Sequence, residues 1–268
     1  MGGRTIGPYT RPLLPEGHDR QHAERPEVPS LSLTGERTLP GVAAENYWYR
    51  RHLAVYEWIA PRCSGLEVLD MGCGEGYGTA VLAEHAARVT GVDADPDAHE
   101  HAVRRYGGPG RYFVRDRVER FAAPCDAIVF LQTIEHLERP DEVLAHFRSL
   151  LRPGGLVYVS SPNVLTLAPA GAPRSDNPFH VREYRADELR ALCESHFEHV
   201  ELLGLFHARK LRVHDLALRA GWDRLHRRLG LTRPFYERFV PAVSARDFVV
   251  RDGPLERALD FVAILRRE

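Results

Sequence analysis

The sequence predicts an α/β fold, with a mostly parallel sheet covered by helices on both faces. Short apolar runs alternate with helical stretches from about residue 65 onward, which is the pattern of parallel strands joined by crossover helices. The chain has 268 residues, of which 44% are hydrophobic, and this is enough for a sizeable core. We therefore expect one domain with additions.

The first forty residues differ in composition from the rest of the chain. Residues 1–40 carry six prolines, several glycines and charged residues, and no sustained periodicity. Such a segment cannot bury enough surface to become ordered alone, so we expect a flexible tail before a domain at 41–268. From Glu45, aromatic and apolar side chains fall on one helical face until Pro61. This pattern predicts a lid or entry helix over 44–61.

Seven strands and several helices follow in order along the chain. The strands are expected at 66–71, 88–92, 112–115, 127–131, 156–160, 199–203 and 259–265, the first five of them parallel. Helices are expected at about 77–87, 97–106 and 141–151, with another beginning at Ala186. The run from Arg152 to Gly155 contains Pro153 and Gly154 and is a strong stop signal after the third of these helices.

A long segment between the last two strands interrupts this alternation. Residues 205–258 are rich in arginine and aromatic residues. We expect them to form an inserted lid segment above the carboxyl edge of the sheet, where loops usually carry substrate specificity.

Bulk properties exclude several classes of protein. The formal net charge of -1 and a pI near 6.9 give no electrostatic footprint for nucleic acid or an anionic membrane, so neither partner is expected. The four cysteines are far apart and form no C-x-x-C pair, which favours a reducing compartment without disulfides. No apolar run reaches the length of a membrane span, and the N-terminus lacks a signal-peptide core. A cytoplasmic location is the expectation.

A glycine-rich loop follows the first predicted strand. Gly72, Gly74 and Gly76 allow the backbone to turn tightly and to approach a ligand, while the N–H groups of the next helix point inward. The dinucleotide fingerprint requires G-x-G-x-x-G, but the last position counted from Gly72 is Tyr77. The spacing therefore disfavours NAD and indicates another nucleotide-like ligand.

Acidic residues stand at the ends of the first three strands. Asp70, before the loop, can meet an amino-acid end of the ligand directly or through water and backbone groups. Asp93 ends the second strand about 20 residues beyond the glycines, where a carboxylate can accept hydrogen bonds from both ribose hydroxyls. Asp116 follows the third strand and is placed for an adenine amino group. The other expected cofactor-binding residues are Cys73, Ala94, Arg117 and Gln132.

These elements, in this order, resemble the class I S-adenosylmethionine-dependent methyltransferases over residues 65–163. The resemblance implies S-adenosylmethionine as the methyl donor and a seven-stranded Rossmann-like sheet whose last strand is antiparallel. The late apolar run at 259–265 agrees with such a strand. Arg50, Arg51 and His52 on the entry helix are further candidates for contact with the cofactor carboxylate.

A polar run follows the fourth strand, where the methyl group would be presented. His136 is a candidate general base, because imidazole titrates near neutrality and an acceptor oxygen must lose its proton on methylation. Glu135 and His136 can equally cap a helix or hold a loop. His180 lies in the long loop after the fifth strand, which we expect to fold over the same edge. Glu135, His136 and His180 are therefore the candidate catalytic residues.

The same residues resemble a metal site. In methyltransferases that act on small-RNA 3′ ends and on ubiquinone precursors, a Glu-x-x-Glu-His segment binds a divalent metal, joined in the RNA enzymes by a later histidine. The resemblance implies Mg²⁺ or Mn²⁺ on Glu135, His136 and His180. Gln132 replaces the first glutamate, and its neutral amide is a poorer ligand for a hard cation. A metal would lower the pKa of an acceptor hydroxyl, whereas the metal-free alternative uses His136 or His180 as base.

A narrower resemblance concerns the acceptor. Residues 33–40, 45–52 and 177–180 are similar to actinobacterial methyltransferases associated with methylated polysaccharides, which implies a hydroxyl of a sugar or oligosaccharide. One alternative is a phenolic or natural-product acceptor in an apolar pocket under the insertion. RNA 2′-hydroxyl methylation is disfavoured by the near-neutral charge, although arginines between 209 and 238 can form a local patch. A non-enzymatic binding module is disfavoured by the intact Glu135, His136 and His180, and the oligomeric state stays open.

Overall fold

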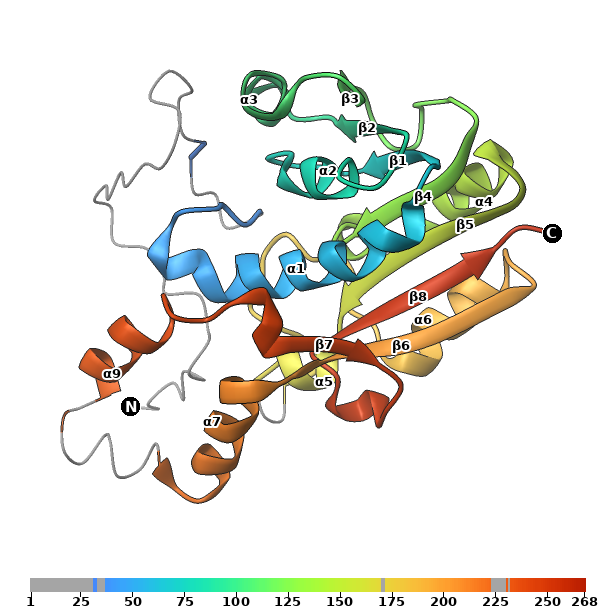
Figure 1. Cartoon of the computed structure of the whole chain (residues 1–268). Helices are drawn as coiled ribbons and strands as arrows, with labels where there is room; N and C mark the ends of the chain where they lie inside the picture. The colour runs from blue at the N-terminus through green and yellow to red at the C-terminus, as the bar shows by residue number, and fades with distance from the viewer. Residues whose placement is uncertain (1–30, 33–36, 170–171, 223–229, 231) are drawn as a thin grey trace.

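One mixed sheet organises the chain in the computed structural model, which describes residues 31–32, 37–169, 172–222, 230 and 232–268. Among these residues the sheet has eight strands in the order β3-β2-β1-β4-β5-β8-β6-β7 (Figure 1). The strands are β1 (Glu67–Met71), β2 (Arg88–Asp93), β3 (Arg111–Arg115), β4 (Cys125–Leu131), β5 (Leu151–Pro162), β6 (His199–His207), β7 (Phe248–Arg251) and β8 (Asp260–Arg266).

The predicted Rossmann-like α/β fold is confirmed, but the predicted number of strands is wrong by one. β1 to β5 pair in parallel, and the last strand, β8, runs antiparallel between β5 and β6. The eighth strand is β7, which lies inside the segment expected to be an insertion and, among the described strands, pairs with β6 alone. Its four residues alternate between buried and exposed, too short a run to be distinguished from a loop by its pattern.

β5 also begins earlier than predicted. The register of β4 against β5 shifts between Cys125 and Ala127, so the run from Arg152 to Gly155 forms a bulge inside the strand rather than a stop before it. Gly154 has φ +78°, and its N–H donates to the carbonyl of Arg267 at 3.0 Å. The glycine thus permits a backbone conformation that most residues avoid.

Eight helices belong to the part of the chain that is described. They are α1 (Asn46–Ile59), α2 (Tyr77–Leu82), α3 (Pro96–Tyr106), α4 (Pro140–Leu150), α5 (Val164–Leu167), α6 (Ala186–Glu194), α7 (Arg209–Arg219) and α9 (Thr232–Phe239). α2 ends at Leu82 rather than near residue 87, because tight turns after it bring the N–H of Ala87 to the carbonyl of Leu66. None of the described helices is both long and apolar enough to cross a membrane.

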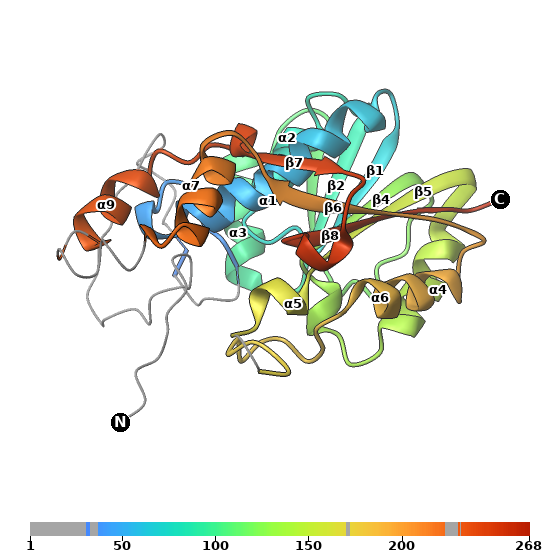
Figure 2. The ribbon, with the colours of Figure 1, turned by 90° about the horizontal axis from the view of Figure 1, so that it is seen from below.

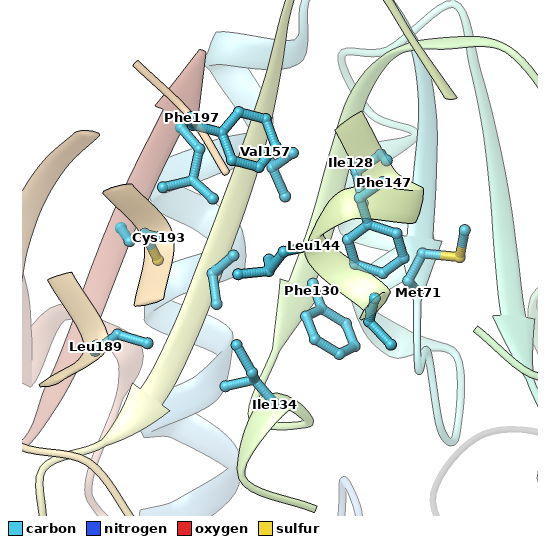
Figure 3. Close-up of a cluster of buried hydrophobic side chains, with 14 of the residues drawn as sticks. Met71, Ile128, Phe130, Ile134, Leu144, Phe147, Val157, Leu189, Cys193 and Phe197 are labelled. Atoms are coloured by element: carbon cyan, nitrogen blue, oxygen red, sulfur yellow. The ribbon is translucent and has the colours of Figure 1, made fainter. Parts of the chain in front are cut away.

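The helices form a layer on each face of the sheet (Figures 1 and 2). α1 and α2 contribute to one cluster of buried apolar side chains, and α4 and α6 contribute to the other. Figure 3 shows the second cluster, in which Phe130 of β4 meets Phe147 of α4 edge to face with ring centroids 5.0 Å apart. Each large side chain buried in this way contributes about 1.5–3 kcal/mol. The strand ends that bear the candidate site therefore rest on a packed core.

The carboxyl ends of β1, β2, β4 and β5 meet at one edge, which we call the carboxyl edge. The loop after β1 and the loop after β4 touch there, because a Cβ added to Gly72 would lie 2.7 Å from Oγ1 of Thr133. Glycine is thus needed at position 72 both for this contact and for its φ of +73°. The predicted cofactor loop and the predicted acceptor segment are direct neighbours.

Candidate cofactor and acceptor sites

The glycine loop is shaped by the carboxylate of Asp93. The backbone N–H of Gly74 donates to Oδ2 of Asp93 at 2.8 Å, and Oδ1 accepts the N–H of Asp95 at 2.9 Å. Gly72, Gly74 and Gly76 all have positive φ, which only glycine adopts readily. Asp93, at the end of β2, therefore lies beside the glycine loop and holds it.

Asp70 lies beneath the loop rather than on its surface. Its carboxylate is fully buried, accepting the Tyr56 hydroxyl at 3.1 Å and the Thr79 hydroxyl at 2.6 Å. Burial raises the pKa of Asp70 to about 6. Cys73 is buried as well, and burial raises the pKa of its thiol well above the ordinary value. Of the two routes predicted for Asp70, this arrangement favours the indirect one, through the backbone of the loop.

The remaining predicted cofactor residues of β2 and β3 lie together. The N–H of Asp116 donates to the carbonyl of Asp93 at 3.1 Å, and Oδ1 of Asp116 accepts the N–H of Arg117 at 2.8 Å. Ala94 and Arg117 are exposed at the same place. The loops after β1, β2 and β3 thus form one continuous rim.

The segment after β4 begins with a strained residue. Gln132 has φ +51°, which is uncommon for a residue with a side chain. Its amide nitrogen donates to Oγ of Ser160 at 3.0 Å, and its backbone N–H donates to the Ser160 carbonyl at 3.0 Å. These bonds direct the Gln132 side chain toward β5.

Glu135 is a buried carboxyl with an unused oxygen. It lies on the single-turn helix Ile134–His136 and is 1% exposed, and burial raises its pKa to about 8. Among the described residues, Oε2 has no hydrogen-bond partner. Its backbone carbonyl accepts the N–H groups of Val181 and Arg182, so Glu135 also holds the long loop after β5.

His136 and His180 face each other across this loop, as predicted. Their ring centroids are 5.1 Å apart. Nδ1 of His136 donates to the Phe179 carbonyl at 2.9 Å, which fixes the tautomer and leaves the lone pair on Nε2. Burial lowers the pKa of His136, assisted by the neighbouring His180. Both effects favour the neutral ring, which is the form that acts as a base or a metal ligand.

His180 is held at both ring nitrogens. Nδ1 lies 2.8 Å from Oε1 of Glu183, and Nε2 lies 2.9 Å from the amide nitrogen of Asn177. Although burial opposes ionisation, hydrogen bonds from Ser175 and His180 lower the pKa of Glu183. The ionised Glu183 thus keeps the proton on Nδ1, and Nε2 faces Asn177.

Glu135, His136 and His180 form a group with the spacing of a metal site. One ligand atom from each lies within 4.8 Å of the others. Two imidazoles and a carboxylate suit a divalent transition metal, and ligand atoms about 2.1 Å from a common ion would be at most about 4.2 Å apart. The group fits a metal after a small contraction, and within the described part of the chain the buried Oε2 of Glu135 has no hydrogen-bond partner.

Comparison with known proteins decides the family. Residues 44–216 match the family model described as a methyltransferase domain. The chain belongs to the methyltransferase family. This methyltransferase is 39% identical over 251 residues to a Mycolicibacterium smegmatis protein named "Probable S-adenosylmethionine-dependent methyltransferase", covering 89% of this chain and 96% of the relative. It is accordingly an enzyme that uses S-adenosylmethionine.

Two further similarities are more distant. The methyltransferase is 33% identical over 183 residues to a ubiquinone biosynthesis O-methyltransferase of Albidiferax ferrireducens, covering 61% of this chain and 70% of the relative. A Thermotoga maritima structure, described as a methyltransferase and possible histamine N-methyltransferase, matches with a TM-score of 0.57 at 15% identity. It covers 83% of this chain and 92% of that chain, which shows a shared fold.

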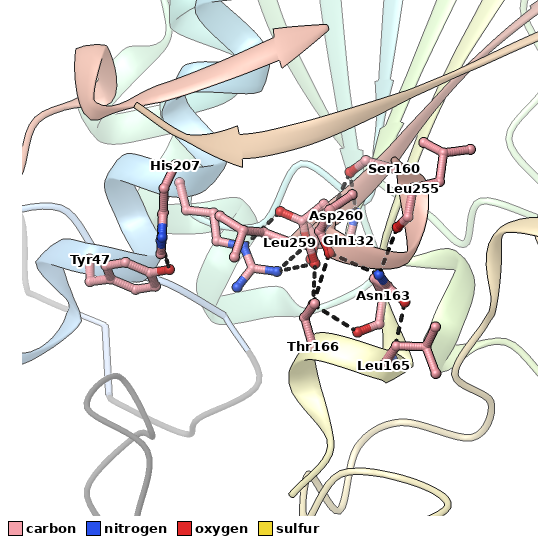
Figure 4. A network of polar contacts seen from close by, with 12 residues as sticks. Tyr47, Gln132, Ser160, Asn163, Leu165, Thr166, His207, Leu255, Leu259 and Asp260 are labelled. Carbon is pink, nitrogen blue, oxygen red and sulfur yellow. Dashed lines mark hydrogen bonds and ion pairs between the residues drawn. The ribbon is translucent and has the colours of Figure 1, made fainter. Parts of the chain in front are cut away.

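Arg51 of this methyltransferase was a candidate for contact with the cofactor carboxylate, but it is bound to other protein groups. It is 4% exposed, donating from Nε to Oδ2 of Asp260 at 2.7 Å and from Nη2 to the Leu259 carbonyl at 2.6 Å. Figure 4 shows Asp260 and Leu259 among these polar contacts, together with the pair formed by Tyr47 and His207. The Tyr47 hydroxyl lies 2.7 Å from Nε2 of His207. Arg51 thus fastens α1 to the start of β8 instead of approaching the cofactor.

Glu75 lies within the glycine loop and contacts α3, which the sequence patterns did not reveal. It stands between two loop glycines but is 3% exposed, with Oε2 accepting the Tyr106 hydroxyl at 2.9 Å and Oε1 lying 2.9 Å from Nε2 of His101. Both partners belong to α3, so Glu75 attaches the loop of the methyltransferase to that helix. A charged residue inside a glycine loop was the available signal.

Proposed function

We propose that this methyltransferase methylates a hydroxyl oxygen, with His136 as the general base. The observation that carries the proposal is the His136 ring, whose Nδ1 is held by the Phe179 carbonyl while Nε2 keeps its lone pair. The acceptor oxygen attacks the sulfonium methyl in line, the carbon–sulfur bond breaks, and S-adenosylhomocysteine leaves. The hydroxyl proton passes to Nε2 of His136.

We assign the cofactor to the rim formed by the first three loops. Asp93 is the acceptor for the ribose hydroxyls, Asp116 is the acceptor for the adenine amino group, and the backbone from Gly72 to Gly76 carries the methionine part. Ala94 and Arg117 flank the adenosine, and Gln132 closes the side next to the acceptor. Support comes from the bond between Asp93 and Gly74 and from the contact of Gly72 with Thr133.

A divalent metal, Mg²⁺ or Mn²⁺, is the second element of the proposal. Glu135, His136 and His180 would hold it, and His180 would release Asn177 to do so. When bound, such an ion supplies a positive charge that lowers the pKa of an acceptor hydroxyl. His136 is then a ligand rather than the base, so the metal-dependent and metal-free forms assign it different roles.

The acceptor we propose is a sugar or oligosaccharide hydroxyl. The support is the similarity of residues 33–40, 45–52 and 177–180 to methyltransferases associated with polysaccharides. Phe179 is 37% exposed beside His180 and offers a ring on which a sugar face can stack. A phenolic acceptor is the second candidate, favoured by the partial similarity to a ubiquinone biosynthesis O-methyltransferase and by the exposed Val181.

Methyl transfer to a panel of acceptors tests the proposal. Short glucans, mannans and a catechol are incubated with labelled S-adenosylmethionine, with and without a stringent chelator. Labelling of glucans or mannans supports a sugar acceptor, and labelling of the catechol alone replaces it with the phenol. Activity that survives chelation would rule out a metal requirement.

Two histidine variants separate the base from the fold. His136→Gln should abolish most transfer in the chelator-treated enzyme, whereas His199→Gln, which alters an exposed histidine on β6, should leave it unchanged. Full activity of His136→Gln under chelation would eliminate His136 as the base.

A further inference from the structure

A short segment before α1 lies against the glycine loop. Oγ1 of Thr38 is 3.2 Å from the Tyr77 hydroxyl and 3.4 Å from Nδ1 of His52. Arg37 donates from Nη2 to Oδ2 of Asp95 at 2.8 Å. Thr38 is 4% exposed and Leu39 is 5% exposed, so this segment is packed rather than loosely attached. We call residues 37–39 the strap.

The strap is attached at the end of the cofactor loop and beside the residue that binds the loop. Tyr77 is the first residue of α2 and directly follows Gly76. Asp95 follows β2, two residues after Asp93, whose Oδ2 accepts the N–H of Gly74. Because Arg37 and Thr38 are adjacent in the chain, the strap connects the end of the glycine loop to the turn that follows Asp93.

Asp95 is bonded to both Arg37 and Asp93 and so links the strap to Asp93. Oδ1 of Asp95 caps α3 by accepting the N–H groups of Asp97 and Ala98, at 2.8 and 3.0 Å. Its own N–H donates to Oδ1 of Asp93 at 2.9 Å. Arg37 occupies the other oxygen, so it restrains the residue that orients the Asp93 carboxylate.

We propose that the strap retains the bound cofactor, and that Arg37 and Thr38 are positioning residues of the cofactor site. The inference rests on the cofactor placement proposed above. S-adenosylmethionine and S-adenosylhomocysteine occupy the rim beside the strap and leave faster when the strap is released. Arg37 acts through Asp95 and Thr38 acts through Tyr77, and neither needs to touch the reacting atoms.

The kinetic signature of this role is faster cofactor dissociation with little change in the chemical step. The side chains of Arg37 and Asp95 are 14% and 35% exposed, so their ion pair is of modest strength. Its loss should raise the dissociation rate of S-adenosylhomocysteine about three- to fivefold. The KM for S-adenosylmethionine rises by a similar factor, and kcat stays within about twofold or increases where product release limits turnover.

Stopped-flow displacement of S-adenosylhomocysteine from the full chain measures this rate. Arg37→Ala and Asp95→Asn are compared with wild type, because asparagine still caps α3 but lacks the charge that pairs with Arg37. Thr38→Val removes the hydroxyl at the other attachment point while keeping the volume. Arg104→Ala is the matched control, since Arg104 is an exposed arginine of α3 that pairs with Glu100 on the same helix.

The expected result is faster dissociation in the three strap variants, an unchanged rate in Arg104→Ala, and no further increase in the double variant Arg37→Ala/Asp95→Asn. Dissociation rates equal to wild type in Arg37→Ala and Asp95→Asn would overturn the proposed role of the strap. Binding of S-adenosylhomocysteine by the wild-type protein would in that case still support the methyltransferase assignment. Equal acceleration by Arg104→Ala would also overturn it. If Asp93→Asn leaves S-adenosylhomocysteine binding unchanged, the cofactor placement is refuted, and the proposed role of the strap is refuted with it.

Discussion

Replacing Glu135 with glutamine should flatten the pH dependence of the stability of the metal-free protein. Glu135 is 1% exposed, and burial raises its pKa from 4.5 to about 8. Between these values the folded protein keeps a proton that the unfolded chain has released. The free energy of unfolding of wild type therefore falls as the pH rises from about 4.5 to about 8.

The magnitude follows from the same two values. They differ by 3.5 pH units, and at about 1.4 kcal/mol for each unit the full effect is at most about 5 kcal/mol. Water entry and relaxation around an ionised Glu135 reduce it, so we expect a loss of about 2–3 kcal/mol between pH 5 and pH 8. Glutamine has no ionisation in this range, but its buried amide costs about 1–3 kcal/mol at every pH. The slope, rather than the absolute stability, is the informative quantity.

Urea denaturation at pH 5, 6.5 and 8 in the presence of a chelator measures this slope. Glu138→Gln is the control, because it removes a carboxylate from an exposed position three residues away. Glu135→Gln should remove about 2 kcal/mol of the pH-dependent loss, whereas Glu138→Gln should leave it within about 0.5 kcal/mol. Parallel slopes for wild type and Glu135→Gln would refute the burial argument.

Three other substitutions test the site and the fold. His136→Gln should lower single-turnover methyl transfer about 10²–10⁴-fold in chelator while cofactor affinity by calorimetry stays within about twofold; a large affinity loss would contradict its role as base. Gly72→Ala should cost at least about 2 kcal/mol in urea denaturation, because its φ is +73° and Thr133 lies 2.7 Å from the new Cβ. Arg51→Met should cost about 3–5 kcal/mol by leaving Asp260 buried without its cation, and a cost below about 1 kcal/mol would contradict this role of Arg51.

The fold could be predicted from the sequence because its strands leave a strong pattern. β1 is buried at four of its five residues, and α3 has a capping aspartate and begins with a proline, so both elements are visible locally. β7 has neither kind of signal. Its pairing with β6 depends on a return of the chain after about forty residues, and no local preference encodes that contact.

The candidate site could be predicted only as far as residue types and strand ends allow. Placing Asp93 and His136 at the carboxyl edge needed only the order of the strands. The burial of Asp70 depends on Tyr56 and Thr79, and the pairing of Arg51 depends on Asp260, which is 209 residues away in the chain. Such partners follow from packing in three dimensions. They decide whether a charged side chain faces a ligand or the protein.

The pairing of β6 with β7 closes a long connection, and this affects which part of the enzyme can change in length. His207 and Phe248 are paired across the two strands, and the N–H of Ala208 donates to the carbonyl of Asp247 at 2.7 Å. The forty residues between them, which include α7 and α9, therefore leave and re-enter the sheet at one point. The entropy of closing a loop grows only with the logarithm of its length, so a change in the length of this span costs the sheet little in closure entropy. Leu211 and Val243, which pack in the same core cluster as α1, must keep their contacts. Exchanging the exposed part of this span between relatives would test whether it carries acceptor preference.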